Sequence, residues 1–132
     1  MFDENKPKIY GLDDVDFNKL VYIVEGPIDS MFLPNCLAMA GSSATANFLG
    51  QLPGGFTIIM DNEPRNEQII AQVEKHIENN YNVCLWPDYI PYKDVNDMIM
   101  GGMTSDEIKA VIDSNTFNGL QAKMRLVSWR KI

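Results

Sequence analysis

Residues 20–29 read LVYIVEGPID, and this stretch decides the fold. The apolar run 20–24 is rich in β-branched residues, which is typical of a strand buried on both faces of a parallel sheet. The run stops at Glu25-Gly26, and Pro27 suits the first turn of a helix. A buried strand that leads directly into a helix is the repeating unit of α/β proteins.

The same pattern recurs along the chain. Apolar runs at 36–40, 56–60 and 83–86 predict three further strands. Between and after them, helix-like segments are expected at 44–52, 64–79, 95–101 and 105–113, the last opened by a capping-box pattern at 104–107. The sequence therefore predicts an α/β fold with a four-stranded, mainly parallel sheet flanked by helices.

Size and composition fit one domain. The chain has 132 residues, of which 45% are hydrophobic. We expect an N-terminal extension at 1–18, the main domain at 19–114 and a basic C-terminal tail at 115–132. An apolar run long enough to span a membrane and a signal peptide are both lacking in the sequence, and Cys36 and Cys84 lie in apolar segments. These features predict a cytoplasmic protein with reduced cysteines.

The charge is strongly acidic and unevenly distributed. The formal net charge is −7, which by itself argues against binding to a phosphate backbone. Residues 114–132 carry Lys123, Arg125, Arg130 and Lys131 and no acid, which leaves seven of the 11 basic side chains with all 18 acidic ones. An acidic body can still act on nucleic acid if divalent metal ions neutralise some of its carboxylates.

Acidic residues gather where the predicted strands end. Glu25 and Asp61 each follow a strand directly, and Asp29, Glu63 and Asp94 come shortly after strand ends, as does Asp97. Open α/β sheets bind ligands at this edge. Converging carboxylates repel one another unless they share a cation, and Mg²⁺ prefers oxygen ligands. The layout predicts a metal site, but it also fits receiver-type phosphorylation domains and haloacid-dehalogenase-type phosphatases, for which Glu25 is a poor match.

Three segments resemble the Toprim family. VEGPID at 24–29 resembles its first signature, an apolar strand followed by Glu-Gly-x-x-Asp. IIMDNE at 58–63 resembles the second, with Glu63 in place of the usual second aspartate, and KDVND at 93–97 resembles a segment of phage and mitochondrial-type primase–helicases. The resemblance covers about residues 19–101 and is strongest to the catalytic domain of DnaG-type DNA primases of tailed bacteriophages.

The resemblance implies a Mg²⁺-dependent nucleotidyl transferase, with Mn²⁺ as a substitute, that makes RNA primers on single-stranded DNA from nucleoside triphosphates. It implies that Glu25 is the catalytic acid–base and that Asp61 and Glu63 are the core metal ligands, supported by Asp29 and Asp94. Lys93 and Arg65 are expected to face phosphate or nucleic acid, and a replicative helicase is the expected partner. A nuclease of the OLD type and a non-catalytic Toprim module remain as alternatives.

Other residues are given structural roles. His76 is expected on a helix surface or half-buried, and Trp86 and Trp129 in the core or at an edge. Gly41 to Ala44 forms either a phosphate-binding turn or an ordinary tight turn.

Overall fold

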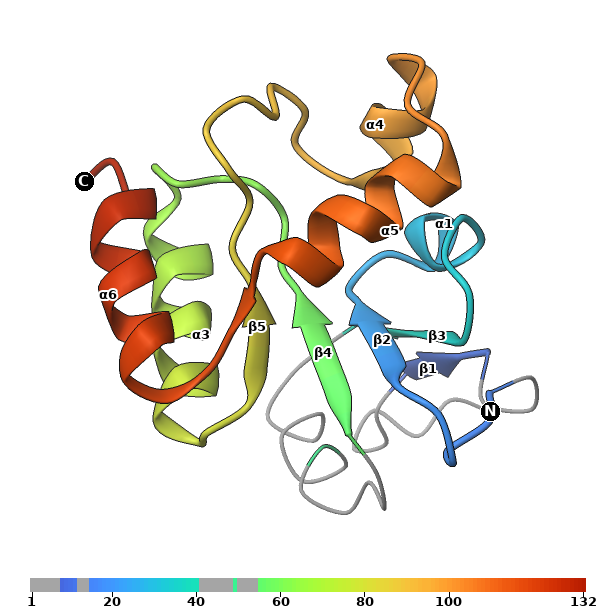
Figure 1. The fold of residues 1–132 in the computed structure, drawn as a ribbon, viewed down its shortest axis with the longest axis horizontal. Coiled ribbons are helices and arrows are strands. Elements are labelled where there is room, and N and C mark those ends of the chain that lie inside the picture. The colour runs from blue at the N-terminus through green and yellow to red at the C-terminus, as the bar shows by residue number, and fades with distance from the viewer. Residues whose placement is uncertain (1–7, 12–14, 41–48, 50–54) are drawn as a thin grey trace.

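The computed structural model describes residues 8–11, 15–40, 49 and 55–132, and these form a sheet with helices on both faces (Figure 1). Its central strands are β2 (Val21–Val24), β3 (Cys36–Ala40), β4 (Phe56–Ile59) and β5 (Asn82–Cys84). The helices are α1 (Pro27–Ser30), α3 (Glu67–Glu78), α4 (Val95–Met100), α5 (Ser105–Ser114) and α6 (Gly119–Trp129).

The order of the central strands is β3-β2-β4-β5, and every neighbouring pair is parallel. This confirms the predicted α/β fold and its four parallel strands. Two short strands extend the sheet, because β1 (Lys8–Tyr10) pairs antiparallel with β3 and β6 (Thr116–Phe117) pairs antiparallel with β5. The described residues thus form a six-stranded sheet.

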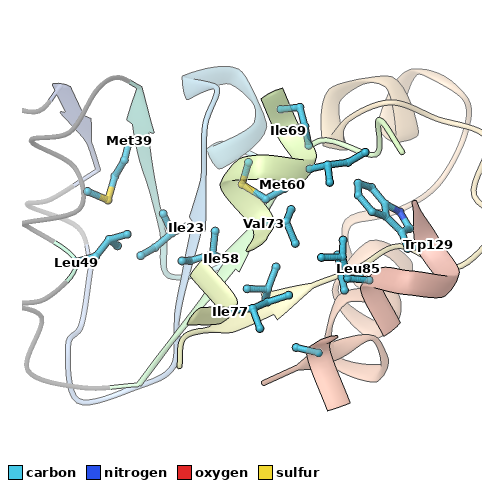
Figure 2. Packing of buried hydrophobic residues seen from close by; sticks show 14 of the residues in the cluster. Ile23, Met39, Leu49, Ile58, Met60, Ile69, Val73, Ile77, Leu85 and Trp129 are labelled. Carbon is cyan, nitrogen blue, oxygen red and sulfur yellow. The ribbon is translucent and has the colours of Figure 1, made fainter. Parts of the chain in front are cut away.

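Each face of the sheet has its own apolar core. Helices α3 and α6 cover one face, where Val73, Ile77 and Trp129 share a core with strand residues such as Ile23 and Ile58 (Figure 2). On the other face, Met98, Ile108 and Ile112 of α4 and α5 pack with alternate residues of the same strands, which include Tyr22, Val24 and Cys84. Because both faces are covered, β2 is buried along its whole length, as its apolar run predicts.

Several local expectations are confirmed. Thr104 and Glu107 form the reciprocal capping box at the start of α5. Asn66 caps α3 by accepting hydrogen bonds from two backbone N–H groups, so this helix begins slightly later than the predicted 64. Cys36 and Cys84 are free and buried, and burial raises the pKa of the Cys36 thiol to about 12. None of the helices among the described residues has the length and apolarity needed to cross a bilayer.

The segment 115–132 is not a projecting tail. It forms β6 and α6, and α6 buries Ala122, Leu126 and Trp129 against the sheet and α3. At the other end, residues 8–10 of the expected extension pair with β3. The predicted turn at 41–44 and, apart from Leu49, the predicted helix at 44–52 lie outside the described residues.

The packing of α6 predicts a large difference between two neighbouring substitutions. Leu126→Ala should lower the free energy of unfolding by about 2–4 kcal/mol, because it leaves a cavity where a buried leucine was. Val127→Ala should change it by less than about 0.5 kcal/mol, since Val127 is 74% exposed. Urea unfolding of both variants measures the difference, and equal small effects would mean that α6 is not part of the cooperative core.

Candidate metal centre

The first two acidic motifs lie at the same edge of the sheet. Strands β2 and β4 are parallel neighbours, so Glu25 after β2 and Asp61 just after β4 follow adjacent strand ends. Strand β5 lies next to β4, and the loop that follows it leads to Asp94 and α4. The fold therefore brings the three motifs to the edge where open α/β sheets bind ligands.

Three of the predicted ligands converge. Asp29, Asp61 and Asp94 each offer a carboxylate oxygen, and the three oxygens lie within 4.8 Å of one another. Asp29 is only 8% exposed, and the other two side chains are partly buried. The group therefore joins one acid from each of the three motifs, although those motifs are far apart in the sequence.

The N-terminus of α4 holds two of these aspartates. Asp29 Oδ1 accepts a hydrogen bond from the backbone N–H of Asn96 at 2.8 Å. Asp94 is the N-cap of α4, and its Oδ1 accepts from the backbone N–H of Asp97 at 2.8 Å. Backbone donors at a helix start stabilise carboxylates, so both aspartates are oriented by capping interactions. Each aspartate keeps its second oxygen for another partner.

Burial and mutual repulsion make these acids costly to ionise together. Burial, as the largest cause, and the negative charges of Glu25, Asp29, Asp94 and Glu63 together raise the pKa of Asp61 to about 6. Burial also raises the pKa of Asp29, opposed by the Asn96 hydrogen bond and assisted by repulsion from Asp94, Asp97 and Glu25. Desolvation is thus a larger cause of the raised pKa values than the repulsion between the carboxylates.

The donor set fits Mg²⁺. At Mg–O distances of 2.0–2.1 Å, two ligands on opposite sides of the ion are about 4.2 Å apart. Three oxygens within 4.8 Å of one another are close enough for side-chain rotation to bring them around one ion, where adjacent ligands would be about 2.9 Å apart. Three carboxylates are oxygen donors only, as this cation prefers, and the partly exposed positions of Asp61 and Asp94 leave room for water or phosphate.

The remaining predicted site residues lie outside this group of three. Glu25 is exposed, and its charge acts on both Asp29 and Asp61. Glu63 faces Lys93 at an Nζ–Oε1 distance of 4.0 Å, with side chains 29% and 56% exposed, so this ion pair is weak. Arg65 is exposed in the turn before α3. Glu63 thus lies outside the converging group, and its role as a core metal ligand beside Asp61 stays a prediction.

The residues that were expected to have structural roles are buried or half-buried. Trp86 and Trp129 are buried at 1% and 4% exposure, and each indole N–H donates a hydrogen bond. His76 is half-buried on α3, and burial lowers its pKa. Asn62, between Asp61 and Glu63, received no role from the sequence, although its side chain makes three hydrogen bonds.

The raised pKa of Asp61 predicts how stability depends on pH in the metal-free protein. Its folded pKa, about 6, lies above the unfolded value near 3.8, so the folded state binds the proton more tightly. The resulting penalty is present above pH 6 and is relieved as the pH falls from 6 to 4. Asp61→Asn should therefore be more stable than wild type by about 1–2 kcal/mol at pH 7.5 and lose that advantage towards pH 4.

Urea unfolding in a chelator measures this difference, because the other titrating groups are common to both proteins. Asp88→Asn is the matched control, since the Asp88 side chain is 83% exposed and, among the residues that the structure describes, pairs only with Lys131 at 3.6 Å. If Asp61→Asn is less stable than wild type at pH 7.5, or if its gain in free energy of unfolding grows as the pH falls, the pKa of Asp61 is not raised.

Comparison with known proteins adds one relationship. No protein-family model matches the chain. The chain is 38% identical over 128 residues to the DNA primase of Enterobacteria phage T4, and the matched part is 95% of this chain and 36% of that primase. The chain thus spans little more than a third of the length of the curated relative. Nearly the whole length of this chain is therefore related in sequence to a part of a phage DNA primase.

Proposed function

We propose that this chain is the Toprim catalytic domain of a DNA primase and that it makes RNA primers on single-stranded DNA by Mg²⁺-dependent nucleotidyl transfer. The observation that carries the proposal is the 38% identity to a phage DNA primase over 95% of the chain. The convergence of Asp29, Asp61 and Asp94 supports it, because this chemistry needs a site for divalent metal ions beside the substrate phosphates.

Each site residue has a defined role in the proposed reaction. Asp29, Asp61 and Asp94 would hold Mg²⁺, or Mn²⁺ in its place, with Glu63 as a further ligand. A metal ion held there would supply neutralisation of phosphate charge and would favour the ionised form of the attacking hydroxyl. Glu25, exposed beside the group, accepts the proton of that 3′-hydroxyl. The O3′–Pα bond forms as the bond from Pα to the pyrophosphate breaks.

Lys93 and Arg65 contact the triphosphate or the template backbone. The Lys93–Glu63 distance of 4.0 Å indicates a weak pair, so Lys93 can exchange this contact for a phosphate oxygen. That exchange also frees the Glu63 carboxylate for the metal ion. The Lys93–Glu63 pair would then couple binding of the nucleotide to binding of the metal ion by Glu63.

The acidic charge argues that the domain depends on other components for template binding. With a net charge of −7, it has few clustered cations with which to neutralise DNA phosphates. Arg130 and Lys131 are engaged with Glu74 and Asp88, which reduces the positive charge that α6 presents. We propose that a basic partner segment or a replicative helicase in the host cytoplasm delivers the single-stranded template.

The direct test is ribonucleotide polymerisation on single-stranded DNA with Mg²⁺, resolved on a gel. We expect little product from the chain alone and clear primers when the replicative helicase from the same source is added. Efficient priming by the chain alone would refute the dependence on a partner. If the DNA is cleaved and no primers form, with or without the helicase, the site would be reassigned to a Toprim nuclease of the OLD type. The absence of both priming and cleavage would favour a non-catalytic module.

A further inference from the structure

Asn62 connects the second acidic motif to the third. Its backbone N–H donates to the carbonyl oxygen of Lys93 at 2.6 Å. Its side-chain Nδ2 donates to the carbonyl oxygens of Ile90 at 3.0 Å and Tyr92 at 3.1 Å. One residue thus makes three hydrogen bonds to the loop that follows β5. These contacts satisfy three polar groups in a partly buried place, where unpaired groups are costly.

The same side chain also connects to the C-terminal helix. Asn62 Oδ1 accepts a hydrogen bond from Trp129 Nε1 at 3.2 Å. Trp129 is the last residue of α6, is 4% exposed and packs in the core cluster with Leu85 (Figure 2). Two residues later, the backbone N–H of Lys131 donates to the carbonyl oxygen of Pro64 at 2.8 Å. The end of α6 is therefore bonded to the loop 61–66 at two points.

We propose that Asn62 and Trp129 are positioning residues that set the separation of Asp61 from Asp94. Asp61 directly precedes Asn62, and Asp94 directly follows Lys93, whose carbonyl oxygen Asn62 binds. The carboxylates of Asp61 and Asp94 have oxygens within 4.8 Å of each other, so they repel when no metal ion lies between them. Hydrogen bonds between the two loops therefore help to keep the aspartates from moving apart. The inference rests on the proposed metal site and extends it to an outer layer of side chains that includes the C-terminal helix.

The chemistry of the two side chains suits this role. An amide supplies two donor hydrogens for the loop carbonyls and one acceptor oxygen for the indole. Aspartate at position 62 would turn a carboxylate towards the carbonyls of Ile90 and Tyr92 and add charge beside Asp61. The indole N–H is the only polar group of Trp129, so Trp129→Phe removes the donor and keeps an aromatic ring in the core.

The test is calorimetric titration with Mn²⁺ of the wild type, Asn62→Ala and a control, Asn35→Ala. Asn35 also makes three side-chain hydrogen bonds, one from the Asp16 N–H at 2.7 Å and two to the carbonyl oxygens of Asp16 and Leu20 at 3.0 and 2.8 Å. It lies before β3, at the opposite end of the sheet from the acidic group. Its φ of 48° makes alanine at least as unfavourable there.

Asn62→Ala should weaken Mn²⁺ binding about 10–100-fold, as is usual for outer-shell partners of metal ligands, whereas Asn35→Ala should bind as wild type does. Trp129→Phe should weaken binding a few-fold, and the double variant Asn62→Ala/Trp129→Phe should be no weaker than Asn62→Ala, because both act through one contact. If Asn62→Ala fails to fold, Trp129→Phe carries the test alone.

Absence of Mn²⁺ binding by the wild type would overturn the proposed metal site itself. Binding by the wild type with unchanged affinity in both Asn62→Ala and Trp129→Phe would overturn only the positioning role. An equal loss of affinity in Asn35→Ala would also overturn it, because the effect would then reflect general destabilisation.

Discussion

Glu25→Gln is expected to reduce primer synthesis by about 10²–10⁴-fold, the usual contribution of a general acid–base group. Glutamine keeps the shape of the side chain and removes its capacity to accept a proton. Glu25 is exposed after β2, so the substitution should leave the free energy of unfolding nearly unchanged. Single-turnover primer extension in the presence of the helicase measures the loss.

Glu78→Gln is the matched control, because Glu78 is an exposed glutamate at the end of α3 and is outside the acidic group. It makes the same change of charge and should retain full activity. Glu25→Gln should also bind Mn²⁺ nearly as well as wild type if its role is proton transfer. A loss of metal binding equal to the loss of activity would instead make Glu25 a ligand.

The second large effect is expected at Asp61. Asp61→Asn should lower the affinity for Mn²⁺ by more than the roughly 10–100-fold typical of outer-shell residues, because it removes a direct ligand, and priming should fall with it. Asp88→Asn is the control, since the Asp88 side chain is 83% exposed and lies outside the converging group. Equal Mn²⁺ binding by wild type and Asp61→Asn would remove Asp61 from the proposed ligand set.

The same variant separates site function from folding. Removing a carboxylate whose pKa is raised to about 6 should stabilise the metal-free protein at neutral pH while it abolishes metal binding. Added Mn²⁺ should stabilise the wild type in proportion to the logarithm of its concentration and leave Asp61→Asn unaffected. These opposite effects cannot arise from a variant that is merely misfolded.

The central fold could be predicted because its strands are buried on both faces. The continuous apolar runs of β2, β3 and β4 have no other simple interpretation, and the structure places them within one or two residues of the predicted bounds. The edge strands β1 and β6 are too short to show a pattern. The basic residues of 115–132 led to the prediction of a tail where the structure has helix α6. Its buried residues Ala122, Leu126 and Trp129 do recur with helical spacing.

The site could be predicted only in part. Strand ends locate Glu25 and Asp61 at one edge, because neighbouring parallel strands end together. The proximity of Asp29 and Asp94 depends on the N-terminus of α4 docking on Asp29 through Asn96, a tertiary contact with no local signal. The bonds of Asn62 to a loop 28 residues away and to Trp129 are equally invisible to sequence patterns.

The most direct measurement of the central claim is an anomalous difference map from crystals of this chain soaked in Mn²⁺. We expect a peak bonded to carboxylate oxygens of Asp29, Asp61 and Asp94, which already lie within 4.8 Å of one another. The peak should be absent from crystals of Asp61→Asn. A map with no peak at this edge of the sheet, or a peak that persists in Asp61→Asn, would contradict the proposed metal site.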